Sequence, residues 1–155
     1  MLDKLDDIDR AILKILQKDA KTVAKSIAEE LGLTKTPVYE RIKRLEKEGF
    51  IKNYVAILDK EKIGESITVF SFVSLETQKG AMMDEFFEDV KRYPEVVECF
   101  VVGGEFDFLL KVVVKNLDAY YDFAKIKIAS LPSIGSVKSA FVLNEVKNDT
   151  TFPLL

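Results

Sequence analysis

The stretch AEELGLTKTPVYERIKRL, residues 28–45, decides the fold of the N-terminal third of this chain. Gly32 interrupts a helical pattern there, and glycine permits the left-handed conformation that ends one helix and turns the chain. Ala28, four residues earlier, supplies the small side chain that two closely crossing helices need. The stretch therefore predicts two helices joined by a tight turn, which is the geometry of a helix-turn-helix.

The helix after this turn is predicted from Thr34, its expected N-cap, to Glu48, with Gly49 as its stop. Pro37 falls in the first turn, where its missing N–H would have no partner within the helix. The apolar face is formed by Val38, Ile42 and Leu45. This helix is expected to pack one face and expose the other.

Two helices are predicted upstream from apolar residues at helical spacing. These residues are Ile8, Ile12, Ile15 and Leu16 in the first helix, and Val23, Ile27, Ala28 and Leu31 in the second. We expect the first helix to end near Lys18 and the second to be capped by Thr22. Residues 1–50 are therefore predicted to be a helix-turn-helix domain of winged-helix-like type.

Composition excludes several classes of function. The chain of 155 residues has no histidine, the side chain most used for proton transfer near neutral pH and for binding transition metals. Its one cysteine, Cys99, can form neither an internal disulfide nor a thiolate zinc site, and we expect it to be packed. No apolar run approaches the ~18 residues of a membrane helix, and the N-terminus is acidic rather than signal-like. A cytoplasmic protein without a cofactor or metal is expected.

Charge is distributed unevenly along the chain. The net charge is −3, yet residues 1–60 hold 13 Lys and Arg against 11 Asp and Glu, which leaves 10 against 15 for the remainder. Basic residues concentrate around the third helix: Lys35, Arg41, Lys43, Arg44, Lys47 and Lys52. A local positive field on one helix is typical of a DNA-facing element.

The outward face of the third helix is predicted to contact DNA. In a helix-turn-helix, residues near the start of the second helix approach base edges, while basic groups further along hold phosphates. We assign Lys35, Thr36, Tyr39 and Glu40 to base edges, and Lys43, Arg44 and Lys52 to phosphates. The alternative is the ordinary solvated face of an amphipathic helix, which the preceding turn disfavours.

Three motifs carry a resemblance to a known family. LDDIDRAIL (residues 5–13), GLTKTPVYERIKRLEKEGFI (residues 32–51) and GEFDFLL (residues 104–110) resemble the leucine-responsive and asparagine-operon (Lrp/AsnC) regulators, also called feast/famine regulators. Lys35 stands where members often have proline. The resemblance implies a DNA-binding transcriptional regulator, and it suggests that residues 51–58 form a linker strand that pairs with a second subunit.

The C-terminal part repeats a strand-helix-strand pattern. The predicted elements are strand 67–75, helix 81–92, strand 96–102, strand 106–114, helix 117–131 and strand 137–146. We therefore expect an α+β chain: a linker at 51–64, then a ferredoxin-like βαββαβ domain at 65–155. Apolar side chains on both faces of strand 67–75 favour cover by a second subunit. The resemblance implies a homodimer that assembles into tetramers or octamers.

The resemblance implies an effector site between subunits of the C-terminal domain, lined in part by the loop between the second and third strands. Carried over residue by residue, it comprises Gly103, Gly104, Glu105 and Asp107, with Ser136 and Ser139 from the loop before the last strand. Val137 replaces the usual threonine of that second loop. The implied effector is an amino acid, and the alternative for the first loop is a hairpin turn with solvated acids.

Other functions remain open at this point. An architectural protein would wrap DNA without sequence preference, against which the acidic C-terminal part argues. Siroheme decarboxylases share this two-part architecture, but they rely on a histidine that is missing here. An amino-acid-binding module that acts on a partner enzyme would leave the basic helix unexplained.

Overall fold

The computed structural model describes residues 5–76, 80–131 and 134–154, apart from the side chains of residues 80–82. The chain forms two compact units, Met1–Ile57 with Lys147–Leu155, and Leu58–Val146. The C-terminal tail thus belongs with the helical unit, whereas the sequence prediction placed it in the C-terminal domain. The tail packs there because Leu154 contacts the helical core and Gln17 Nε2 donates to the Phe152 carbonyl at 3.3 Å.

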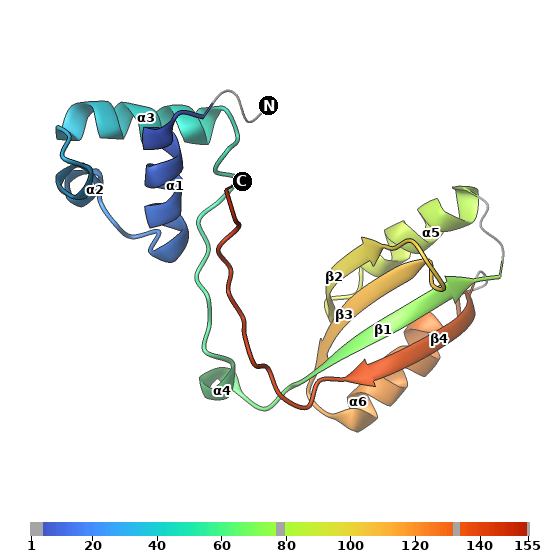
Figure 1. Cartoon of the computed structure of the whole chain (residues 1–155). Coiled ribbons are helices and arrows are strands. Elements are labelled where there is room, and N and C mark those ends of the chain that lie inside the picture. The colour runs from blue at the N-terminus through green and yellow to red at the C-terminus, as the bar shows by residue number, and fades with distance from the viewer. Residues whose placement is uncertain (1–4, 77–79, 132–133, 155) are drawn as a thin grey trace. The chain divides into compact units, whose positions relative to one another are not determined.

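The first unit contains the three predicted helices, α1 (Asp7–Lys18), α2 (Ala24–Leu31) and α3 (Lys35–Lys47) (Figure 1). Gly32 ends α2 in the left-handed conformation with φ 67°, as the turn requires. Thr34 is the N-cap of α3 by position, but its side chain makes no capping bond. The N-cap of α2 is Val23 rather than Thr22, so the helix begins one residue later than predicted and has no side-chain cap.

Asp6 is the N-cap of α1, a role that the apolar pattern of the sequence did not predict. Its carboxylate accepts from the backbone N–H of Asp9 at 2.8 Å, and the carboxylate of Asp9 accepts from the backbone N–H of Asp6 at 3.2 Å. This reciprocal capping box satisfies N–H groups that have no partner within the helix. The helices enclose a core of Leu5, Ile12, Leu13, Leu16, Ile27, Ala28, Val38 and Leu45.

The second unit is an antiparallel sheet with strand order β2-β3-β1-β4, and it confirms the ferredoxin-like βαββαβ prediction. Its elements are α4 (Lys60–Ile63), β1 (Ile67–Leu75), α5 (Gly80–Lys91), β2 (Val96–Val101), β3 (Phe108–Val114), α6 (Leu117–Asp122), η2 (Phe123–Ile128) and β4 (Ile134–Phe141). The strands β1 and β3 lie at the centre of the sheet, and β2 and β4 form its edges.

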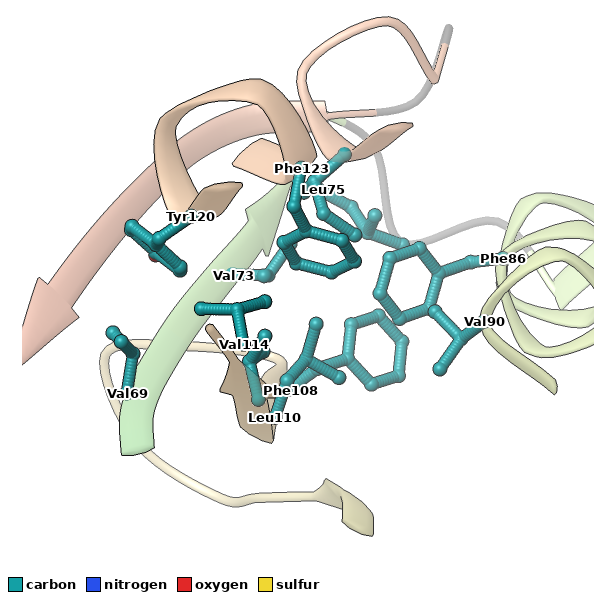
Figure 2. Packing of buried hydrophobic residues seen from close by; sticks show 12 residues of the cluster. Val69, Val73, Leu75, Phe86, Val90, Phe108, Leu110, Val114, Tyr120 and Phe123 are labelled. Carbon is teal, nitrogen blue, oxygen red and sulfur yellow. The ribbon is translucent and has the colours of Figure 1, made fainter. Parts of the chain in front are cut away.

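One face of this sheet carries the core of the second unit. Alternate residues of β1 and β3 pack there against side chains from α5, α6 and η2, as Figure 2 shows. Phe108 is fully buried, and its ring stacks on Phe86 with the centroids 4.3 Å apart and meets the edge of Phe87 at 5.6 Å. The opposite face, which we call the open face, includes Phe70 and Phe72, and no helix of the described residues of this unit packs on it.

Several sequence predictions need correction. Within the described residues of a single chain, the segment 51–58 is not assigned to a strand, and its predicted pairing with a second subunit stays a prediction. The last strand is Ile134–Phe141 instead of 137–146, and its register against β1 runs from Leu75 to Val69. The predicted helix 117–131 changes from α-helix to π-helix at Phe123. Cys99, expected to be packed, is exposed on β2, which has a neighbouring strand on one side only in the described sheet.

Candidate nucleic-acid interface and effector site

The first two turns of α3 present the four residues assigned to base edges. Lys35, Thr36, Tyr39 and Glu40 are all exposed, whereas Val38 and Leu45 on the opposite side are fully buried. Each residue advances a helix by roughly 100°, so burial of Val38 turns its two neighbours on either side outward. The four side chains therefore share one solvent-facing end of the helix.

Lys43 extends this exposed face one turn further along α3. Its ammonium donates to Glu46 at 2.9 Å and lies 5.8 Å from the centre of the Tyr39 ring. The hydrogen bond to Glu46 raises the pKa of Lys43, so the side chain stays charged at neutral pH. Lys52 is exposed in the segment after α3, apart from the helix face.

Glu46 also links α3 to the segment that follows it. The hydroxyl of Tyr54 donates to Glu46 at 3.0 Å, and burial together with this bond raises the pKa of Tyr54 to about 12. The hydrogen bond from Lys43 lowers the pKa of Glu46. Two hydrogen bonds to Glu46 therefore link Tyr54 and Lys43.

Arg44 differs from the other expected phosphate contacts because its guanidinium is partly engaged inside the protein. It donates to the carboxylate of Asp9 on α1, and Arg41 donates to the same carboxylate at 2.7 Å. These hydrogen bonds raise the pKa of both arginines. The sequence analysis named Asp9 only as part of a motif; its signal was an aspartate on the apolar side of helix α1.

The turn between β2 and β3 holds three of the expected effector residues. Gly103, Gly104 and Glu105 are exposed, and Gly104 has a φ of 136°, which disfavours any other residue. Glu105 accepts from Lys138 of β4 at 2.6 Å, and the Lys138 ammonium lies 4.9 Å from the centre of the Phe106 ring. Phe106 also contacts Phe72 of β1, with a centroid distance of 5.2 Å. This turn is therefore tied to the open face of the sheet.

Asp107 lies next to this turn but has a structural contact. Its carboxylate accepts from the backbone N–H of Leu75 at 2.8 Å, and its own N–H donates to the carbonyl of Val73. Those bonds attach the start of β3 to the end of β1. The carboxylate of Asp107 is therefore partly used by a structural hydrogen bond, whereas Glu105 is exposed at the surface.

The structure does not bring Ser136 and Ser139 together. Both lie within β4 rather than on a loop, opposite Ser74 and Ser71 of β1 respectively. Because side chains alternate between the faces of a strand, an odd spacing places them on opposite faces. Ser136 shares the open face with Lys138, and Ser139 bonds to the hydroxyl of Tyr120, which also contacts buried Ser71 at 2.8 Å.

Within the described residues, we find no group of three or more potential metal ligands. In the same residues, no helix is long and apolar enough to cross a membrane. The surfaces best suited to bind a ligand are thus the exposed face of α3 and the β2–β3 turn. A chain with a helix-turn-helix and a separate ferredoxin-like unit has the organisation of a ligand-responsive DNA-binding protein.

Comparison with known proteins assigns both units. Residues 5–52 match the winged helix-turn-helix DNA-binding family, and residues 68–152 match the Lrp/AsnC ligand binding domain. The chain is 38% identical to the Bkd operon transcriptional regulator of Pseudomonas aeruginosa, covering 97% of this chain and 99% of that protein. It is 36% identical to the leucine-responsive regulatory protein of Klebsiella pneumoniae, covering 92% and 87%.

Solved structures agree over the same length. An AsnC family transcriptional regulator from Agrobacterium tumefaciens gives a TM-score of 0.91 at 38% identity, covering 97% of each chain. A transcriptional regulator from Neisseria meningitidis in complex with L-methionine gives 0.91 at 31% identity, also covering 97% of each. The chain belongs to the Lrp/AsnC family. It is a transcriptional regulator with DNA-binding and ligand-binding domains, and not an enzyme.

Proposed function

We propose that α3 is the recognition helix of this regulator and reads an operator in promoter DNA. The observation that carries the proposal is the division of α3 into a buried side, Val38 and Leu45, and an exposed N-terminal end. Lys35, Thr36, Tyr39 and Glu40 at that end contact base edges, while Lys43, Arg44 and Lys52 contact phosphates. A DNA-binding role also implies action in the cytoplasm, where a regulator of this type meets its promoters.

The chain is proposed to act as a homodimer. No strand among the described residues pairs with the segment 51–58, and Val55, Ile57 and Leu58 are each more than 60% exposed. Pairing of this segment with its copy in a second chain, and cover of the open sheet face, would remove both from water. A two-fold dimer places two recognition helices on a pseudo-palindromic operator, and dimers assemble further into tetramers or octamers.

A DNase I footprint on the region upstream of the protein's own gene tests the DNA-binding proposal. A dimer predicts two protected half-sites whose centres are roughly 10–10.5 base pairs, or a multiple, apart. Thr36→Ala should abolish the protection, and Lys14→Ala on the exposed side of α1 serves as the matched control. Uniform protection at any sequence would instead support architectural wrapping of DNA.

An amino acid is proposed as the effector, bound at the β2–β3 turn on the open face of the sheet. Support comes from the exposure of Gly103, Gly104 and Glu105 and from Lys138, which donates to the Glu105 carboxylate. The Neisseria structure contains L-methionine, and a relative is leucine-responsive by name. Ser136 lies on this side of the sheet. Asp107 instead accepts from the Leu75 N–H, and the Ser139 hydroxyl bonds to the hydroxyl of Tyr120.

A thermal-shift screen of the twenty amino acids, with light scattering, tests the effector proposal. A ligand at a hundred times its Kd stabilises the folded state by about 2.7 kcal/mol, which such a screen detects. Glu105→Gln should reduce the shift, and Glu88→Gln, an exposed exchange on α5, should leave it intact. If no amino acid changes melting or assembly, the effector proposal fails.

A further inference from the structure

The carboxylate of Asp9 lies completely buried between α1 and α3, and each of its oxygens accepts from a different arginine. Arg41 Nη1 donates to Oδ1 at 2.7 Å, and Arg44 Nη2 donates to Oδ2. Arg41 donates to Asp6 as well, at 2.7 Å. A buried charge without partners is strongly unfavourable, so these bonds fix both guanidinium groups against α1.

The two arginines are not equally available to a ligand. The side chain of Arg44 is 41% exposed and that of Arg41 is 29% exposed. A guanidinium has five N–H donors in a rigid plane, and the bond to Asp9 uses a donor at only one corner. Arg44 can therefore keep its bond to Asp9 while the remaining donors face outward from α3.

Lys43, beside Arg44 on the sequence, is held much less firmly. Its partner Glu46 lies on the same helix, and the two side chains are 54% and 30% exposed. Exposed pairs of this kind are weak and screened by salt. Lys43 therefore adds a charge without a fixed position to the DNA-facing side of α3, whereas the guanidinium of Arg44 is held in one orientation by Asp9.

We propose that Asp9 is a positioning residue for DNA binding that acts through Arg44. It orients the guanidinium so that the outward N–H groups meet the DNA backbone in one register on the recognition helix. Asp6 and Asp9 together offset the charges of Arg41 and Arg44, so Asp9 adds fixed geometry and no attraction for DNA. The inference rests on the proposed function of α3.

The test is a double-mutant cycle on the full-length protein with Asp9→Asn, Arg44→Gln and both together. Fluorescence anisotropy measures the Kd for the gene's own upstream DNA and for a random duplex across a salt series. Asp9→Asn should weaken specific binding about tenfold, the scale of one charge-assisted hydrogen bond. Random-duplex binding should stay equal or tighten, because a negative charge is lost. In the Arg44→Gln background, Asp9→Asn should cause no further loss of specific binding.

Two controls separate positioning from charge and from folding. Asp7→Asn removes the same charge from the exposed first turn of α1 and should leave the ratio of specific to random binding unchanged. Arg44→Lys keeps the charge, leaves the bond between Asp9 and Arg41 in place, and should lose specific binding while keeping random binding. It therefore tests the idea even where Asp9→Asn fails to fold, which thermal unfolding reveals.

Equal loss of specific and random binding, or additive losses in the double variant, would overturn the positioning role. So would an Arg44→Lys variant with wild-type specificity. A wild-type protein that shows no preference for its upstream region gives a different result, because it removes the proposed function of α3 and the positioning role with it.

Discussion

Replacement of Phe108 by leucine probes the core of the second unit. The ring is fully buried and contacts Phe86 at 4.3 Å and Phe87 at 5.6 Å. Aromatic pairs contribute about 0.5–1.5 kcal/mol each beyond the area they bury, so loss of two pairs costs about 2 kcal/mol. In a unit of this size that loss lowers Tm by roughly 8–16 °C.

Differential scanning calorimetry measures the shift, and hydrogen exchange locates it. Peptides from β1 and β3 should lose protection, while peptides from α1 and α3 keep theirs. Phe152→Leu is the matched control, because that ring is 73% exposed and its hydrogen bonds to Gln17 are made by the backbone. A Phe108→Leu shift no larger than that of the control would refute the packing argument.

Three further predictions follow from the first unit. Gly32→Ala should lower the free energy of unfolding of this unit by about 1 kcal/mol or more in a denaturant titration, since φ is 67° there. The same exchange at Gly103 of the second unit, which has no positive φ, should lower the stability of that unit less. Hydrogen bonds from the Asp9 backbone and from Arg41 lower the pKa of Asp6 in the folded state. The stability that Asp6 contributes is therefore present above its unfolded pKa near 3.8 and is lost as pH falls through the lower folded pKa. In an acid titration of stability, the Asp6→Asn variant should lack this loss. Truncation after Val146 removes the tail contacts with Gln17 and should lower the melting temperature of the helical unit, and an unchanged melt would contradict the assignment of the tail to that unit.

Local patterns were sufficient to predict the helices and the sheet. Gly32 predicted the turn because its requirement for a left-handed conformation depends only on the residue itself. The spacing of Val38 and Leu45 predicted the buried face of α3, and both side chains are fully buried. These features depend on neighbours within a few positions along the chain.

The features that the sequence analysis missed depend on contacts between distant residues. Asp9 meets Arg44 across 35 positions, and no spacing rule pairs them. The last strand was predicted to reach Val146, but β4 ends at Phe141, where one further bond, from the Val142 N–H to the Thr68 carbonyl, joins it to β1. The opposed faces of Ser136 and Ser139 follow from the pairing of β4 with β1, which places both serines within one strand.

The most direct test of the account is the ratio of Kd values for random DNA and for the gene's own upstream region. For the wild-type protein we predict a ratio of at least about a thousand at physiological salt. Tyr39→Ala, which removes an exposed side chain of α3, should bring the ratio close to one while random binding keeps its salt dependence. A wild-type ratio near one, or a Tyr39→Ala protein with undiminished preference, would contradict the claim that α3 reads the operator.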